Sequence, residues 1–471
     1  MIVPLALTLA AFAVAVFFII RPTTIKLFGR KLVIDYAWGS IIGAAIILIG
    51  SAVSPGQALN SLVGRPGFSP YTMIIFFMCM AYVSISLDST GFFEYLAVKM
   101  IMRTGGDRKR LFLYFFALSS FITLFTSNDI VILTLTPIIF YFGKHAKINA
   151  VPYLVAEFFA ANIWSMFLYI GNPTNIIVAM ANNVNFFEYS QWMLLPTVVA
   201  GLLNLGIMYL IFRDDVSGKF TIPREINPRE FIRDKVCAWV TLIVFAANIV
   251  MIAISPLIGI EMWVVALVFT GILFLYDFAM AFIESSSERM LFYRVFKRYV
   301  YAKDTKTYRF RLHLIAERMP WKIIPFLACV FVMIESLSVI GFTDLLAAFI
   351  SLISPTIMTA SISMGFVSSL AANVINNQPM TVLFTRVMES PSFTVAGPAR
   401  LASMYSLIIG SNLGANLTLI GALAGIMWAK ILKSKNVGVS YAKFAMLGFI
   451  ITPLVILAAC AVLGLEFMLF G

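Results

Sequence analysis

Charged residues are scarce in this 471-residue chain. Lysine, arginine, aspartate and glutamate make up only 12% of it, whereas 61% of the residues are hydrophobic. A soluble domain carries about twice that share of charged residues, roughly 25%. The composition therefore excludes a soluble globular protein and predicts an all-α polytopic membrane protein.

Residues that commonly bind metals or act as nucleophiles are also few. The chain has four cysteines and two histidines: Cys79, Cys237, Cys329, Cys460, His145 and His313. The cysteines are scattered without metal-ligand spacing, and both histidines lie in basic loops. The chain also contains no phosphate-binding glycine-rich loop and no nucleophile elbow. We therefore expect no catalytic residue, no metal site and no cofactor.

The net charge of +12 is concentrated in a few short segments. With the amino terminus placed outside, 31 of the 34 basic residues fall in predicted cytoplasmic segments: 21–34, 99–110, 143–150, 213–235, 289–322 and 430–443. Such a distribution is typical of topology control and of contact with anionic lipid, and we do not expect nucleic-acid binding. It predicts a multi-pass protein of the cell (plasma or inner) membrane with both termini non-cytoplasmic.

Apolar runs of about 20 residues predict about ten transmembrane helices plus two re-entrant hairpins. Residues 111–142 must turn back, because a full crossing would place Lys144 and Lys147 outside. Each half then has an odd number of spans, five, which predicts two inverted-topology repeats. The predicted organisation is a first repeat (1–212, with hairpin 111–142 and broken helix 152–183), a cytoplasmic linker (213–235) and a second repeat (236–471, with basic loop 284–322, hairpin 356–388 and broken helix 401–428).

Four polar breaks interrupt the apolar arms of the hairpins and broken helices. Backbone that leaves helical geometry inside a bilayer must lie within protein or line a wet cavity, so the breaks predict one substrate site. Its predicted members carry amides or hydroxyls: Ser127, Asn128, Asn172, Thr174, Asn175, Asn376, Asn377, Ser411, Asn412 and Asn416. Such a lining suits a small neutral hydroxylated solute or a cation, and half-helix amino termini would also suit an anion. The alternative is that these residues only cap broken helices.

Three acids in apolar surroundings are candidates for proton coupling. Asp129 is the only acid at a break, and an ionised carboxylate inside a membrane is costly unless it is solvated or paired. Glu157 and Glu335 lie within apolar runs and are second candidates, with a partnered structural role as the alternative. We expect Asp129 to be protonated on one side of the membrane and ionised or paired on the other.

Four stretches resemble the ArsB-type arsenite efflux pumps of the ion transporter (ArsB/NhaD) superfamily. They are residues 87–94 (LDSTGFFE), 127–137 (SNDIVILTLTP), 376–379 (NNQP) and 410–421. The resemblance covers nearly the whole chain. It implies a membrane transporter that exports arsenite and antimonite, coupled to proton entry or, through a separate cytoplasmic ATPase, to ATP hydrolysis.

The resemblance also leaves other substrates of the superfamily open. These are a sodium-coupled anion or dicarboxylate carrier, a sodium/proton antiporter and a silicic-acid exporter. Because no cysteine lies at a break, arsenite would be held as neutral arsenous acid through hydrogen bonds. We expect alternating access of the elevator type, membrane lipid as a partner, and a homodimer. A docking platform that uses the basic loop 284–322 is a further alternative.

Overall fold

The computed structural model describes all residues except 1, 28–29, 65–68, 222–226, 286–307 and 436. The described chain is helical apart from one antiparallel ribbon, β1 (Thr23–Leu27) and β2 (Arg30–Ile34). Two compact units emerge, each drawn from both halves of the sequence. Unit 1 comprises Met1–Ile74, Phe158–Ile211 and Trp321–Gly471, and unit 2 comprises Ile75–Glu157 and Phe212–Pro320.

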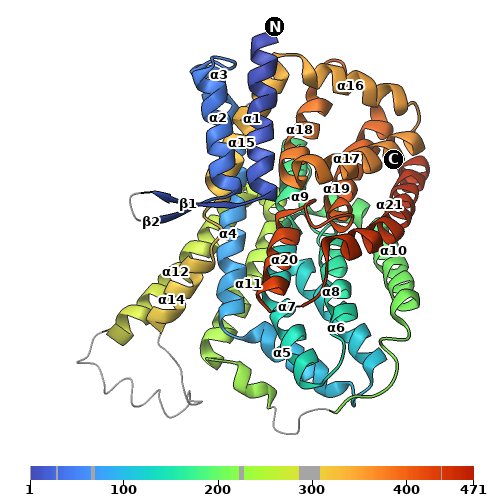
Figure 1. Ribbon diagram of the computed structural model, residues 1–471. Helices are drawn as coiled ribbons and strands as arrows, with labels where there is room; N and C mark the ends of the chain where they lie inside the picture. Colours follow the sequence, from blue (N-terminus) through green and yellow to red (C-terminus); the bar gives the residue numbers. More distant parts are fainter. Residues whose placement is uncertain (1, 28–29, 65–68, 222–226, 286–307, 436) are drawn as a thin grey trace. The chain divides into compact units, whose positions relative to one another are not determined.

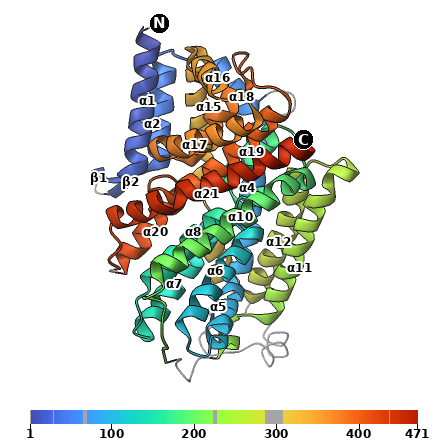
Figure 2. The same cartoon turned by 90° about the vertical axis from the view of Figure 1, so that its right-hand side faces the viewer.

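Unit 1 contains both terminal helices and the second predicted hairpin (Figure 1). Its helices and 3-10 turns are α1 (Ile2–Ile20), α2 (Tyr36–Ile49), α3 (Pro55–Val63), η1 (Tyr169–Gly171), α9 (Pro173–Ala181), nearly all of α10 (Phe186–Phe212), α15 (Ile323–Val339), α16 (Phe342–Ile353), α17 (Ile357–Ile375), α18 (Asn377–Glu389), α19 (Gly397–Leu413), η5 (Gly414–Asn416), α20 (Leu423–Ser434) and α21 (Tyr441–Phe470). Within this unit α17, α19 and α21 pack against one another (Figure 2).

Unit 2 contains the first predicted hairpin and the linker. Its elements are α5 (Phe92–Arg103), α6 (Arg108–Phe125), α7 (Asn128–His145), η2 (Pro228–Phe231), α11 (Lys235–Ile254), η3 (Ser255–Ile258), α12 (Met262–Ser285) and α14 (Tyr308–Arg318). Two helices, α4 (Pro70–Ser89) and α8 (Val151–Trp164), begin in one unit and end in the other.

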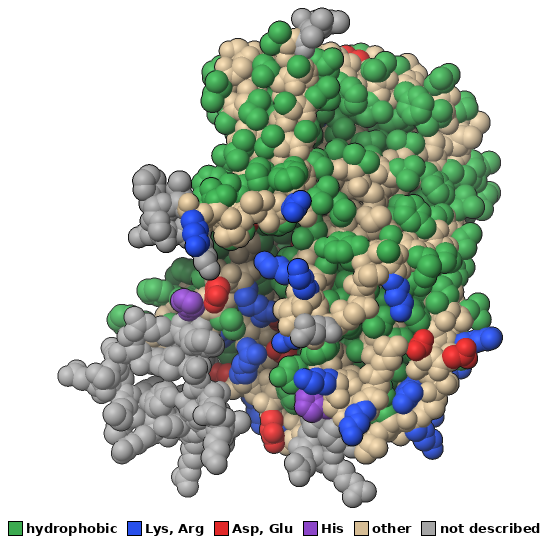
Figure 3. All heavy atoms as spheres, viewed as in Figure 1, with side chains coloured by type: hydrophobic (Ala, Val, Ile, Leu, Met, Phe, Trp, Pro, Cys, Tyr) green, Lys and Arg blue, Asp and Glu red, His purple; other side chains and the backbone are tan. Residues whose placement is uncertain are grey.

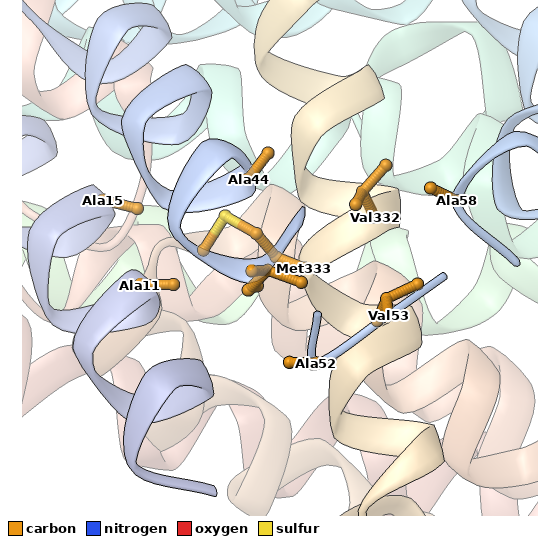
Figure 4. Packing of buried hydrophobic residues seen from close by; sticks show 9 residues of the cluster. Ala11, Ala15, Ala44, Ala52, Val53, Ala58, Val332 and Met333 are labelled. Carbon is orange, nitrogen blue, oxygen red and sulfur yellow. The ribbon is translucent and has the colours of Figure 1, made fainter. Parts of the chain in front are cut away.

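Small residues allow α1, α2 and α15 to pack closely in unit 1. Ala11 and Ala15 of α1 lie in one buried cluster with Ala44 of α2 and Met333 of α15 (Figure 4). A Cβ on Gly43 would lie 2.9 Å from the carbonyl oxygen of Ala11, so only glycine fits this helix contact. Close approach through small residues is the usual way for helices to associate in lipid, where burial of apolar surface gives little driving force.

Eight helices of the described part are long and apolar enough to cross a membrane. Large apolar side chains point outward along them, including Trp239 of α11 at 65% exposure and Leu275 of α12 at 66%. Hydrophobic side chains cover much of the face seen in Figure 3. In water such a surface would aggregate, whereas in a bilayer it faces acyl chains. The protein is therefore an all-helical, multi-pass membrane protein.

The structure corrects several predicted boundaries. The second broken helix stays helical through Leu413, so Ser411 and Asn412 lie in the last turn of α19 and the break covers residues 414–422. The Nδ2 of Asn412 donates to the carbonyl of Ile408 at 2.9 Å, as a side chain facing its own helix can. The first break, which the sequence predicts at residues 171–175, is wider, because α8 already ends at Trp164.

Three described elements were not predicted: α3, the β1–β2 ribbon and α14. The last lies at the end of the basic loop 284–322, most of which falls outside the described residues. The sequence also predicts two short stretches that precede the hairpins, residues 88–102 and 343–353, and helices α5 and α16 form there. However, Asp88 and Ser89, which were assigned to the first of these stretches, belong to the end of α4.

Candidate functional site

The tip of the second hairpin is a one-residue corner, Asn376, between α17 and α18. Asn376 has φ 72° and ψ 151°, a backbone conformation that non-glycine residues rarely adopt. No side-chain hydrogen bond caps α18 at this point. Strain of this kind persists only where surrounding contacts fix the chain, and it is frequent at ligand sites.

Those contacts come from the second broken helix, which lies in the same unit. The backbone N–H of Asn377 donates to the carbonyl of Gly421 at 2.9 Å. The Nδ2 of Asn376 donates to Ile420 at 3.2 Å, and the Nδ2 of Asn377 donates to Ser411 at 3.3 Å. The side-chain nitrogens of Asn376 and Asn377 thus both donate to backbone carbonyls of the broken helix.

The side-chain oxygens at the same tip have no donor in the described chain. Asn376 Oδ1, Asn377 Oδ1 and Gln378 Oε1 are buried and have no hydrogen-bond partner in the described chain. The three residues are only 1%, 2% and 3% exposed. A buried oxygen without a donor is costly, and three in consecutive residues are rare in a folded protein. These three oxygens could therefore accept hydrogen bonds from a bound solute or coordinate a bound cation.

The two broken helices are joined by a dense set of side-chain hydrogen bonds centred on Asn412. Its Oδ1 accepts from Ser165 Oγ at 2.8 Å and from Asn172 Nδ2 at 2.9 Å. Its Nδ2 donates to Asn175 Oδ1 at 2.7 Å. The Nδ2 of Asn175 in turn donates to the carbonyls of Ser165 and Leu168 at 2.7 and 3.2 Å. We call Asn412 and these three partners the cross-brace.

Two further bonds extend the cross-brace on both sides. Asn162 Nδ2 donates to Asn416 Oδ1 at 2.8 Å, and Ser411 Oγ donates to Thr174 Oγ1 at 3.1 Å. All of these residues are at most 2% exposed. Because their amides and hydroxyls bond to one another, these groups position the broken helices in the described conformation and leave the acceptors at the hairpin tip as the open ones.

The tip of the first hairpin lies in unit 2. Ser127 caps α7, its Oγ accepting the N–H of Ile130 at 3.5 Å, and the Oδ1 of Asn128 accepts the N–H of Asp129 at 3.0 Å. The Asp129 carboxylate is half-buried and makes no hydrogen bond or ion pair with the described chain. It stands in the first turn of α7.

The other two candidate acids have partners. Glu157 accepts from Thr136 Oγ1, with both carboxylate oxygens 3.0 Å away, and it is completely buried. Glu335 of α15 pairs with Arg386 of α18 at 2.5 Å, and Arg386 also contacts Glu389 at 2.9 Å. The pair ties the second hairpin to a neighbouring span, which is the structural role named above as the alternative.

Sequence reasoning missed two members of the cross-brace region, Asn162 and Ser165. Asn162 lies in α8 and Ser165 directly follows the last residue of that helix, so in the sequence both look like isolated polar residues in an apolar run. Their positions 250 residues before Asn412 and Ala415 were the available signal, since the sequence predicts that the polar breaks recur at about that interval. Among the described residues, no group of three or more histidine, cysteine or acidic side chains could hold a metal ion.

Comparisons with known proteins agree with this picture of a transporter. A family model described as "Citrate transporter" (CitMHS) matches residues 14–405. The arsenical pump membrane proteins of Yersinia enterocolitica and Escherichia coli K12 are 25% and 26% identical over 92% and 91% of this chain, and over 94% and 93% of their own lengths. A putative arsenical pump membrane protein of Bacillus subtilis is 24% identical, over 92% of this chain and 95% of its own.

A solved structure shares the fold. The YdaH transporter of Alcanivorax borkumensis aligns with 100% of this chain and 98% of its own, with a TM-score of 0.54 and 10% sequence identity. The match of the family model over most of the sequence, together with helices that can span a membrane, settles the class. The chain belongs to the CitMHS citrate transporter family, and it is a secondary membrane transporter rather than an enzyme.

Proposed function

We propose that this protein exports arsenite and antimonite, carried as neutral hydroxylated metalloids, in exchange for protons. The observation that carries the proposal is the row of unpartnered acceptors Asn376 Oδ1, Asn377 Oδ1 and Gln378 Oε1. Arsenous acid presents three hydroxyl groups and no charge, so it can donate one hydrogen bond to each of three oxygens. The names of the relatives support the same substrate class.

The charge around the breaks argues against a polycarboxylate such as citrate. In the described chain, residues 125–129, 162–175, 373–379 and 408–422 include no lysine or arginine. The two arginines closest in sequence to the second hairpin tip are engaged, Arg386 with Glu335 and Arg400 with the carbonyl of Met388. A multiply charged anion would then be desolvated without a counter-charge from a side chain.

A sodium ion is the second candidate ligand for the same three oxygens. Amide and carbonyl oxygens are suitable ligands for a hard cation, and a sodium-coupled transporter would use them in this way. Sodium and arsenous acid differ in one testable respect. Sodium would drive transport, whereas arsenous acid would be the transported solute and a proton gradient would drive its export.

Asp129 is the proposed site of proton coupling, with Glu157 and Glu335 as second candidates. Its carboxylate has no partner in the described chain, so it is open to exchange of a proton. The proposed ligand set keeps Ser127, Asn128, Asn172, Thr174, Asn175, Asn376, Asn377, Ser411, Asn412 and Asn416, and adds Gln378 for its unpartnered Oε1. Within it, we assign Asn172, Asn175 and Asn412 to positioning, because their amides are bonded to each other.

We further propose about ten transmembrane helices and two re-entrant hairpins in two inverted repeats, with both termini non-cytoplasmic. Matching elements recur in the same order in both halves, and α5 and α16 each follow a left-handed glycine, Gly91 and Gly341. Inverted repeats provide two exchanged packings of similar energy, and elevator-type alternating access uses them. A small apolar crevice lined by Phe12, Met333 and Pro379 lies where α1 and α15 meet the second hairpin, and such an apolar contact offers no polar bonds that would oppose the movement.

Transport into inverted membrane vesicles or proteoliposomes tests the function. We expect radiolabelled or mass-detected arsenite to accumulate under an inside-acid proton gradient, with no dependence on sodium. Transport that requires a sodium gradient would favour the second candidate, and citrate accumulation without arsenite transport would overturn the proposal. The assay requires neither the homodimer that we expect nor the cytoplasmic ATPase that the family resemblance implies.

Variants at the tip provide the matched control. Gln378→Met removes the acceptor at nearly constant volume and should raise the arsenite concentration needed for half-maximal transport. Asn182→Ala alters an amide that bonds only to its own helix, through Val178 at 2.8 Å, and should leave transport unchanged. Equal transport by the Gln378→Met variant and the unmodified protein would exclude Gln378 from the site.

A further inference from the structure

The two short helices that precede the hairpins, α5 and α16, begin at glycine corners of the same construction, which we call the hinges. We call these two helices the arm helices. Gly91 between α4 and α5 has φ 82° and ψ 13°, and Gly341 between α15 and α16 has φ 79° and ψ 9°. Each glycine donates its backbone N–H at 3.0 Å to the carbonyl three residues earlier, that of Asp88 or Ser338. Considered by themselves, the two hinges would bend with similar ease.

The first hinge is held by the linker between the repeats. The backbone N–H of Arg233 donates to the carbonyl of Thr90 at 3.0 Å, and its Nη1 donates to the carbonyl of Ser89 at 2.9 Å. Its Nη2 lies 3.3 Å from Glu94 on the first turn of α5. A Cβ on Gly91 would collide with the carbonyl oxygen of Phe231, so the linker backbone lies directly against the hinge.

A second set of contacts comes from α14. Arg318 pairs with Asp88 at 2.7 Å, and the other oxygen of Asp88 accepts from Thr134 of α7 at 2.8 Å. Asp88 is only 1% exposed. Separating this buried pair would leave an uncompensated charge, so the contact resists movement.

Arg311 adds a further anchor about two turns earlier on α14 and reaches the same end of α4. Its Nε donates to Ser89 Oγ at 2.8 Å and its Nη2 donates to Ser86 Oγ at 2.7 Å. It also forms an ion pair with Asp277 of α12, which is 2% exposed. We call Arg233, Arg311 and Arg318 with these partners the hinge clamp.

The second hinge has a single contact of this kind in the described chain, from Ser390 Oγ to Asp344 on the first turn of α16 at 2.5 Å, and no described arginine bonds to residues 338–344. No atom lies within 4 Å of a Cβ placed on Gly341. Val339, two residues earlier, is 47% exposed, whereas residues 87–91 at the first hinge are all buried. Residues 338–342 hydrogen-bond only within α15, α16 and the corner between them, as far as the structure describes their neighbours.

We propose that the hinge clamp holds the α4–α5 hinge rigid, so that arm bending during transport is confined to Gly341. The linker and α14 thereby make the two repeats mechanically unequal although their hinges are alike. The proposal rests on the elevator-type movement of two repeats proposed above and does not depend on the transported substrate. Arg233, Arg311 and Arg318 are positioning residues in this scheme.

Hydrogen–deuterium exchange on the full-length protein in lipid nanodiscs tests the clamp without any substrate. We expect backbone amides of residues 89–95 to exchange at least about tenfold more slowly than those of residues 339–345. The double variant Arg233→Ala with Arg318→Ala should bring the first set close to the rate of the second, which should not change. Arg229→Ala is the matched control, because it removes an exposed arginine of the same linker. Equal exchange at the two hinges of the unmodified protein would overturn the proposal.

A distance measurement covers the case in which the double variant does not fold. Spin labels at Ile75 and Met102 report the angle at the first hinge, and labels at Ile324 and Leu352 report that at the second. In liposomes without substrate, pulsed electron resonance should give one narrow distance distribution for the first pair and a broader or bimodal one for the second. A broad distribution for the first pair with a narrow one for the second would show that the clamp is not the rigid part.

Discussion

Asn412 and Asn175 stand 237 residues apart in the sequence, and the Nδ2 of the first donates to the Oδ1 of the second at 2.7 Å. Both are fully buried, and each belongs to a different broken helix of unit 1. This bond and its neighbours fix the two helices with respect to each other. They also consume the amides that would otherwise be open to a substrate.

Replacing Asn412 by leucine should destabilise the protein strongly. The change leaves Ser165, Asn172 and Asn175 with buried groups that have lost a partner, each at a cost of about 1–3 kcal/mol. We expect a large fall in melting temperature in detergent, measured by intrinsic fluorescence. A melting temperature within a few degrees of that of the unmodified protein, as expected for Asn182→Ala, would contradict the cross-brace.

The pair formed by Arg386 and Glu335 predicts a non-additive double mutant. Arg386→Met alone leaves a largely buried carboxylate without its partner and should cost about 3–5 kcal/mol. Adding Glu335→Gln removes the stranded charge and should restore much of the stability. A double-mutant cycle on the free energy of unfolding in detergent measures the coupling. If the two changes are additive, the Glu335 carboxylate is not stabilised by Arg386, and its role as a proton carrier is favoured over the structural one.

Gly410 and Gly271 form a matched pair of helical glycines. A Cβ at Gly410 would overlap Ser368 Oγ and lie 2.5 Å from the carbonyl oxygen of Gly365, whereas nothing lies within 4 Å at Gly271. Gly410→Ala should therefore force α17 and α19 apart and lower the yield of folded protein. Gly271→Ala should be neutral or stabilise by up to about 1 kcal/mol, because alanine favours the helix. Size-exclusion profiles and melting curves distinguish the two.

Asp129→Asn should abolish transport driven by a proton gradient while the protein stays folded. The substitution keeps the shape of the side chain and removes its ability to carry a proton. Gradient-driven uptake in proteoliposomes, with a melting curve on the same sample, is the measurement. Should the variant keep pH-dependent transport, the coupling would pass to Glu157, whose carboxylate meets Thr136.

Both chain ends should be accessible from the non-cytoplasmic side. The distribution of basic residues is the reason, since 31 of 34 lie in segments predicted to be cytoplasmic. A single cysteine placed next to either terminus of a variant without the native cysteines should react with a membrane-impermeant maleimide on intact cells. Labelling of either end only after permeabilisation would show that this end is cytoplasmic and would contradict the predicted topology.

The sequence was sufficient to locate the polar breaks, because asparagine, glycine and proline inside apolar runs are visible without a fold. It also located Asn376 and Asn377 at the corner between α17 and α18. The boundary of α19 was wrong, because Gly410 and Asn412 are weak helix formers and tertiary contacts decide their conformation. The helix continues there because the Asn412 side chain bonds to Ile408 and to the other broken helix.

The sequence could not predict which asparagines position the broken helices and which have an oxygen open to a ligand. Asn175 and Asn377 have the same chemistry, and only the three-dimensional contacts show that one has its oxygen bonded and the other does not. The clamp at Gly91 was equally hidden. Arg233 lies in a loop of mixed charge, where nothing in the sequence distinguishes an arginine against a hinge from one in solvent.

The cross-brace also constrains how the family can change. A buried donor must meet a buried acceptor, so a replacement at Asn412 is tolerated only when Ser165, Asn172 or Asn175 changes with it. The same holds for Asn162 with Asn416. These positions should therefore vary as linked sets across relatives, whereas Asn376 and Gln378, whose oxygens bond to no other residue that the structure describes, are expected to vary with the transported solute instead.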